Sequence, residues 1–191
     1  MSNIISNAVS LNGSMNHASL VQGIQHSGAD KSIWQHNDMS DLDERLAQVS
    51  ARNQVPCIVF DSVHSTDGDV SSISHICDLA EYYTTTNCID EVRAVGLYVE
   101  HGAGYLKKLD IQDTVNVVNV MLGKYHRVGG RYIETDMGVI DETRLIDSEF
   151  IFTTEMPTVL CNAKYLIAHE ELRARHQAQS NSLIEAGVTV G

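Results

Sequence analysis

The sequence has little basic charge and no long apolar run. In its 191 residues, 25 acidic side chains outnumber 13 basic ones, which gives a net charge of −12. Such a chain repels the phosphate backbone of nucleic acids, so we expect no nucleic-acid partner. No apolar run approaches the roughly 20 residues of a membrane-spanning helix, and the first residues lack the basic and apolar regions of a signal peptide. We therefore expect a soluble, cytoplasmic protein with no membrane contact.

The sequence also lacks the short motifs of several common sites. The cysteines form no C-x-x-C pair, and the histidines form no H-x-x-x-H or H-E-x-x-H arrangement, so we expect no metal site. There is no G-x-G-x-x-G or Walker A loop, which argues against an ordinary nucleotide-binding domain. We interpret the cysteines as small buried hydrophobic residues, namely Cys57, Cys77, Cys88 and Cys161.

The composition is that of a folded domain. With 43% apolar and 20% charged residues and only two prolines, the chain is neither a disordered tail nor a collagen-like fibre. Its length is sufficient to bury a continuous core. We expect one α/β domain over residues 1–191, with residues 1–12 poorly ordered.

Strand and helix patterns alternate in the middle of the chain. Short β-branched runs at residues 55–60, 86–90 and 115–121 predict strands, and the apolar spacing at residues 71–83 predicts a helix. Such alternation is typical of right-handed βαβ units. The predicted fold is therefore a three-layer α/β/α arrangement around a mostly parallel sheet. Helical patterns flank this region at residues 18–26, 40–50, 139–146 and 158–186.

Three chemically useful side chains follow the predicted strands. Ser65 comes after the first strand, Asp90 ends the second, and Lys124 comes after the third. Ligands of open α/β sheets bind at the carboxyl ends of the strands. A hydroxyl, a carboxylate and an amine at neighbouring strand ends form a candidate site, although solvated strand-end residues would give the same pattern.

Nine short segments of the sequence form a recognisable series. They are NHAS (16–19), GIQHSG (23–28), HND (36–38), VHSTDGD (63–69), ICDLA (76–80), DEVRAVGLY (90–98), HGAG (101–104), LGK (122–124) and FIFTT (150–154). In order and spacing they resemble the α-oxoamine synthases, which are pyridoxal-phosphate (PLP) enzymes of the aspartate aminotransferase fold type. The similarity is greatest to the 5-aminolevulinate synthase branch of that family.

The resemblance implies roles for the residues that bind the reactive part of PLP. Lys124 would form the resting Schiff base and later move the Cα proton, and Asp90 would hold a proton on the ring nitrogen. His17 would stack on one face of the ring, and Val92 would pack on the other.

The resemblance also implies contacts at the edge of the cofactor. Ser65 and Arg93 would lie near the phenolic oxygen of the ring. Thr153 and Thr154 would reach the phosphate across a dimer interface, which implies a homodimer with shared sites.

The implied reaction is the decarboxylative condensation of glycine with succinyl-CoA to 5-aminolevulinate, for haem and tetrapyrrole biosynthesis. Sister reactions use other amino acids and acyl-CoA thioesters. The resemblance further implies that the chain corresponds to about half of a protomer, in the central part of the large domain.

Four residues depart from the family pattern close to the expected cofactor. Arg93 stands where the family has His, Met121 where it has Thr, Arg131 where it has Gly, and Glu155 where it has Ser. A thioether cannot donate the phosphate hydrogen bond of a threonine, and arginine is longer than histidine and always charged. The alternative interpretation is a truncated or degenerate relative that keeps the fold as a dimerisation or interaction module.

Overall fold

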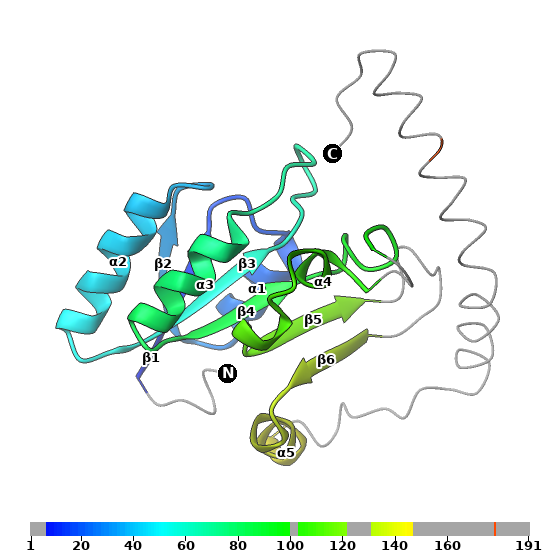
Figure 1. Ribbon diagram of the computed structural model, residues 1–191. Coiled ribbons are helices and arrows are strands. Elements are labelled where there is room, and N and C mark those ends of the chain that lie inside the picture. The colour runs from blue at the N-terminus through cyan, green and yellow to red at the C-terminus, as the bar shows by residue number, and fades with distance from the viewer. Residues whose placement is uncertain (1–6, 100–102, 122–130, 147–177, 179–191) are drawn as a thin grey trace.

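A computed structural model describes residues 7–99, 103–121, 131–146 and 178. Its centre is a six-stranded sheet in the order β2-β1-β3-β4-β5-β6 (Figure 1). The strands are β1 (Ala8–Gly13), β2 (Asp30–Trp34), β3 (Val55–Asp61), β4 (Thr86–Asp90), β5 (Val117–Met121) and β6 (Arg131–Thr135). Strands β1 to β5 are mutually parallel, and β6 is antiparallel to β5. The mostly parallel sheet confirms the predicted fold class.

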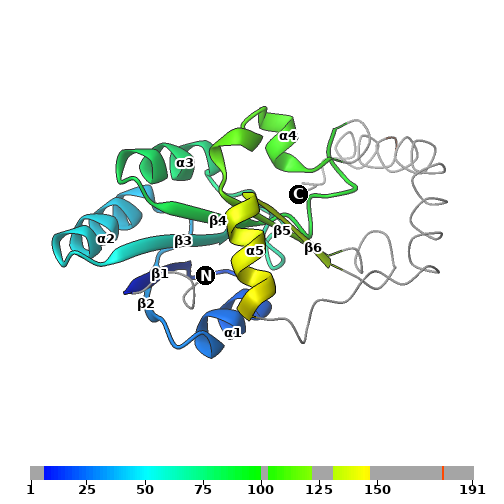
Figure 2. The ribbon, with the colours of Figure 1, turned by 90° about the horizontal axis from the view of Figure 1, so that it is seen from below.

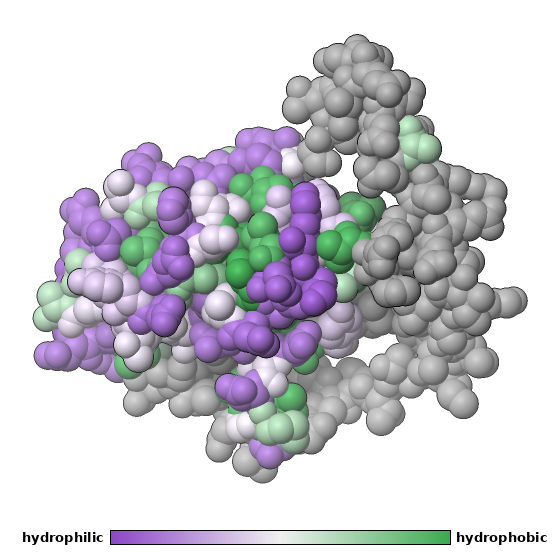
Figure 3. Space-filling model, viewed as in Figure 1, coloured by the Kyte–Doolittle hydropathy of each residue, from purple (hydrophilic) through white to green (hydrophobic). Residues whose placement is uncertain are grey.

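Helices lie on both faces of the sheet and complete the predicted three layers. They are α1 (Ala18–His26), α2 (Met39–Ala51), α3 (Ile73–Tyr82), α4 (Tyr105–Leu109) and α5 (Met137–Ile146), with a short 3₁₀ helix at Gln112–Thr114. Figure 2 shows α2, α3 and α4 on one side of the strands and α1 on the other. The outer surfaces of α2 and α3 are largely hydrophilic, with apolar side chains gathered in a few patches (Figure 3).

Local sequence signals account for the boundaries of α2 and for its buried face. The Asp38 side chain accepts hydrogen bonds from the main-chain nitrogens of Ser40 and Asp41, which caps the first turn. Leu42, Leu46 and Val49 follow at helical spacing and are buried. Helix α3 buries Ile73, Ile76, Cys77 and Ala80 in the same way. These side chains pack on β1, β3 and β4 in one continuous core.

The cysteines of the described residues follow the prediction in part. Cys57 and Cys77 are buried and Cys88 is half-buried, whereas Cys161 lies outside the described residues. Burial raises the pKa of the Cys57 thiol to about 11. Among the described residues, no helix is long and apolar enough to cross a membrane.

The expectation of a poorly ordered segment at residues 1–12 is wrong for residues 8–12, which belong to strand β1 (Ala8–Gly13). This strand pairs with β2 on one side and with β3 on the other, and Leu11 is completely buried. Val9 and Leu11 alternate with Ser10 and Asn12, and these polar residues interrupt the apolar run that would predict a buried strand. Residues 1–6 lie outside the described residues.

One buried carboxylate supports the connection from β4 to α4. Glu91 is 2% exposed, and its oxygens accept hydrogen bonds from the main-chain nitrogens of Tyr105 and Leu106 at 3.0–3.3 Å. Gly104 has a φ of +95°, and a Cβ at this position would overlap Oε2 of Glu91. Glycine is therefore the residue that suits this close approach. Desolvation by burial raises the pKa of Glu91 from 4.5 to about 7, against the lowering effect of these hydrogen bonds.

Leu11→Ala should test whether β1 belongs to the core. We expect the free energy of unfolding to fall by about 2–5 kcal/mol, the usual cost of truncating a buried leucine. Urea denaturation followed by circular dichroism measures this. Ile33→Ala is the matched control, because Ile33 is 48% exposed on edge strand β2 and should change the free energy by less than about 1 kcal/mol. Equal, small effects of the two substitutions would contradict the placement of β1.

Glu91→Gln should flatten part of the pH dependence of stability. Because the folded pKa of Glu91 is raised from 4.5 to about 7, its protonated form favours the folded state, and stability is lost as the pH rises through this range. A shift of this size corresponds to about 3 kcal/mol. Urea unfolding at pH 5 and pH 8 should show the stability of the wild type falling relative to that of Glu91→Gln. Exposed Glu81→Gln is the control, and a pH-independent difference for Glu91→Gln would contradict the assignment.

Candidate functional site

The carboxyl ends of β3, β4 and β5 meet at one edge of the sheet. In the strand register, Asp61 at the end of β3 is the partner of Asp90 at the end of β4. Asp90 is in turn the partner of Asn119 in β5, two residues before Met121. The parallel register thus places two carboxylates and one amide side by side where ligands of such sheets bind.

A narrow pocket opens at this edge of the sheet. It is lined by His17, Ser19, Asp61, Val63, Asp90, Val92, Arg93 and Met121. Four of the predicted site residues, His17, Asp90, Val92 and Arg93, are therefore brought together although they span 77 positions of the chain.

The Asp90 carboxylate is held at the end of β4 by two hydrogen bonds. Its Oδ1 accepts from the main-chain nitrogen of Val92 at 2.8 Å, and its Oδ2 accepts from Nδ2 of Asn119 at 2.9 Å. The side chain is buried, with 7% of its surface exposed. A carboxylate oxygen has two lone pairs, so each oxygen keeps one for a further donor such as a ring N–H. Asn119 was not predicted as a site residue, because only the strand register shows that it reaches Asp90.

His17 stands at the start of α1 and faces the same pocket. Its Nδ1 accepts from the main-chain nitrogen of Ser19 at 3.3 Å and lies 2.8 Å from Oγ of Ser19. The main-chain nitrogen of His17 donates to Oδ2 of Asp61 at 2.8 Å. His17 is therefore a helix cap as well as a pocket residue, and Asp61 fixes its position.

Buried Asn16 connects this helix start to the sheet. Its Nδ2 donates to the main-chain oxygen of Val59 at 2.7 Å and to Oδ1 of Asn12 at 2.8 Å. Its Oδ1 accepts from the main-chain nitrogen of Asp61 at 3.3 Å. The hydrogen bonds of Asn16 thus place His17, the next residue of the NHAS segment, at the edge of the sheet.

The residue types of the pocket fit the ring of PLP. A buried carboxylate suits a protonated ring nitrogen, while an imidazole and a valine side chain suit the two ring faces. The described residues enclose only about 20 Å³, which is room for about one water molecule. Arg93 and Met121 are the longest side chains in the pocket, and both replace shorter family residues. Both side chains have several rotatable bonds, and a ring would enter this pocket only if they rotate out of it.

The remaining predicted site residues do not line this pocket. Ser65 lies exposed in the turn after Val63, so the structure does not bring it to the pocket. Lys124, Thr153, Thr154 and Glu155 lie outside the described residues, as does the helix predicted at residues 158–186 except for Ala178, which is helical and exposed. The same holds for the side chain of Arg131, although its main chain belongs to β6. Lys124 follows Met121 by three residues, which is at most about 10 Å of extended chain.

Comparison with curated proteins finds similar chains over most of this sequence. The 5-aminolevulinate synthase 1 of Cereibacter sphaeroides is 35% identical over 185 residues, which cover 94% of this chain and 45% of that protein. The mitochondrial 5-aminolevulinate synthase of Emericella nidulans is 38% identical over 189 residues, which cover 88% of this chain and 28% of that protein. The chain thus spans less than half the length of these two relatives.

Solved structures share the fold at lower sequence identity. A serine palmitoyltransferase of Sphingomonas wittichii matches with a TM-score of 0.81 at 22% identity, over 93% of this chain and 45% of that one. The 8-amino-7-oxononanoate synthase of Francisella tularensis matches with a TM-score of 0.73 at 21% identity, over 95% of this chain and 54% of that one. The family model for aminotransferase class I and II matches residues 11–186. The protein therefore belongs to the aminotransferase class I and II family.

Proposed function

We propose that the protein is a PLP-dependent acyltransferase of the 5-aminolevulinate synthase type. Its substrates would be glycine and succinyl-CoA, and its products 5-aminolevulinate, CO₂ and CoA. The observation that carries the proposal is the buried Asp90 carboxylate, which lies with His17 and Val92 in one pocket at the carboxyl ends of the strands. The identity of 35–38% to curated 5-aminolevulinate synthases supports this choice of reaction.

Asp90 controls the protonation of the cofactor ring in this proposal. When bound, PLP supplies an electron sink for the negative charge that develops at Cα of glycine. Asp90 would keep a proton on the ring nitrogen, because the hydrogen bonds from Val92 and Asn119 hold its carboxylate in place. Each carboxylate oxygen keeps a lone pair that could accept a hydrogen bond from the ring N–H.

Other residues would bind and orient the cofactor and the substrate. Lys124 would hold the cofactor through Nζ and move the Cα proton. His17 and Val92 would contact the two faces of the ring, and Arg93 would donate a hydrogen bond at its phenolic oxygen.

Thr153 and Thr154 would bind the phosphate of the cofactor from the second protomer of a homodimer. Ser65 would reach the ring only after a rearrangement of its turn. Residues 1–191 would form one α/β domain of a cytoplasmic enzyme.

Cofactor binding can be tested with the purified chain. Addition of PLP should produce an absorbance band of a lysine-bound cofactor, and borohydride should then attach the cofactor covalently to the peptide that carries Lys124. We expect Lys124→Ala to abolish both signals, because it removes the amine that would form the Schiff base with PLP. Lys107→Ala is the control, since Lys107 is half exposed on α4 and should leave both signals unchanged. A wild type without the band, or a covalent label that survives Lys124→Ala, would contradict the proposal.

The release of CoA from succinyl-CoA in the presence of glycine distinguishes the functional alternatives in the same preparation. Turnover with this pair supports the proposed reaction. A PLP band with turnover only for another amino acid or another acyl-CoA would indicate a sister synthase. A folded protein without band or turnover would be the non-catalytic relative.

A further inference from the structure

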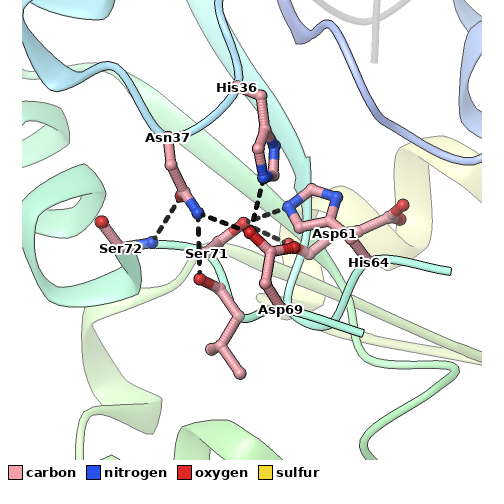
Figure 4. Close-up of polar contacts among 8 residues, drawn as sticks. His36, Asn37, Asp61, His64, Asp69, Ser71 and Ser72 are labelled. Carbon is pink, nitrogen blue, oxygen red and sulfur yellow. Dashed lines mark hydrogen bonds and ion pairs between the residues drawn. The ribbon is translucent and has the colours of Figure 1, made fainter. Parts of the chain in front are cut away.

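Three side chains of types that bind metal ions meet in two loops near Asp61, a residue that lines the pocket described above (Figure 4). His36 lies between β2 and α2, and His64 and Asp69 lie between β3 and α3. One ligand atom from each of these residues lies within 4.8 Å of the others. Nε2 of His36 is 2.7 Å from Oδ2 of Asp69, and the two imidazole rings lie edge to face with centroids 4.3 Å apart.

His64 is the buried member of the cluster. It is 4% exposed, and its pKa is lowered by burial and by the neighbouring His36, against the opposite effects of Asp69, the Met15 main chain and Asp67. Its Nε2 is 2.9 Å from Oγ of Ser71. This nitrogen is the one that faces His36 and Asp69, so a bound ion would take the place of its contact with Ser71 (Figure 4). Neutral imidazole is the form that binds metal ions.

Asp69 has one oxygen in use and one without a partner. Oδ2 faces His36 and also accepts from Nδ2 of Asn37 at 3.3 Å. Oδ1 is buried without a hydrogen-bond partner among the described residues, although 43% of the side chain is exposed. The cluster therefore contains one unsatisfied buried carboxylate oxygen, and it is accessible from solvent through Asp69.

The loops around the cluster are fixed by main-chain hydrogen bonds. The main-chain nitrogen of His64 donates to the main-chain oxygen of Asp69 at 2.9 Å. The Asn37 side chain donates to the main-chain oxygen of Val70 at 3.1 Å and accepts from the main-chain nitrogen of Ser72 at 3.0 Å. Because these bonds hold the ligand-bearing loops in place, an ion would bind without ordering them first.

We propose that His36, His64 and Asp69 bind one divalent transition-metal ion, with Zn²⁺ as the best fit. Two imidazoles and one carboxylate are common zinc ligands, and water would complete the tetrahedral coordination. Ligands at about 2.0–2.2 Å from zinc lie roughly 3.4 Å apart. The 2.7 Å between Nε2 of His36 and Oδ2 of Asp69 would therefore widen, and ligand atoms up to 4.8 Å apart would move closer together. Mg²⁺ and Ca²⁺ prefer oxygen ligands and suit this set poorly. The ion would replace the proton between His36 and Asp69.

The bound ion would join the loop before α2 to the loop after β3. His64 follows Asp61 by three residues, and Oγ of Ser71 donates to the main-chain oxygen of Asp61 at 2.6 Å. The ion would therefore brace the loop next to one wall of the cofactor pocket. Its role would be structural, and its binding does not depend on the proposed catalytic activity.

Metal titration of the chelator-treated full chain tests the site. Calorimetry with Zn²⁺ should give one equivalent, and Co²⁺ should give visible ligand-field bands without sulfur charge-transfer bands. We expect His36→Asn and Asp69→Asn each to weaken Zn²⁺ binding at least about tenfold. His75→Asn is the matched control, because His75 is exposed on α3 outside the cluster and should bind Zn²⁺ like the wild type.

The stability of the same variants gives a second measurement. Zn²⁺ should raise the melting temperature of the wild type and of His75→Asn, because ligands that bind the folded state stabilise it. The melting temperatures of His36→Asn and Asp69→Asn should not respond, and their metal-free circular dichroism spectra show whether they fold. If Asp69→Asn does not fold, His36→Asn still tests the site, because the His36 side chain is partly exposed. Equal Zn²⁺ affinity in all variants, sulfur bands with Co²⁺, or no binding at millimolar Zn²⁺ would overturn the proposal.

Discussion

The parallel register of β3, β4 and β5 is the constraint on which the candidate site depends. It pairs Asp61 with Asp90 and Asp90 with Asn119, so that groups far apart in the sequence share one edge of the sheet. From this edge, Asp61 binds the main chain of His17 at the start of α1, and Asn119 binds the carboxylate of Asp90. A shift of one residue along any of these strands would turn the side chains to the opposite face of the sheet.

The strand register also explains where the residues that differ from the family pattern lie relative to Asp90. Arg93 and Met121 both line the pocket, whereas Asn119 contributes a hydrogen bond to the carboxylate of Asp90. Arg93 and Met121 thus leave less room for the cofactor ring than shorter side chains would. They do not change Asp90, the carboxylate that would bind the ring nitrogen. A long flexible side chain can move, but a missing carboxylate has no substitute. Cofactor binding would therefore depend more on Asp90 than on the volume of the pocket.

The sequence predicted those elements whose local signals agree with their surroundings. The apolar runs of β3 and β4 and the helical spacing of α2 and α3 predict these elements correctly. The motifs predict His17, Asp90 and Val92 as site residues, and the structure places the three in one pocket. Strand β1 was missed because Ser10 and Asn12 interrupt it, and edge strand β2 because most of its side chains are exposed. The contacts of Asn119 and Asp61 depend on strand register, which spacing along the chain does not show. The turn exposing Ser65 likewise follows from the tertiary structure.

The most direct test of the account is the protonation state of the ring nitrogen in the bound cofactor. PLP labelled with ¹⁵N in the ring can be bound to the wild type, to Asp90→Asn and to Asp78→Asn, an exposed control on α3. At neutral pH, the account predicts the ¹⁵N chemical shift of a protonated ring nitrogen in the wild type and the control, and that of an unprotonated nitrogen in Asp90→Asn. An unprotonated nitrogen in the wild type, or identical shifts in all three proteins, would contradict the account.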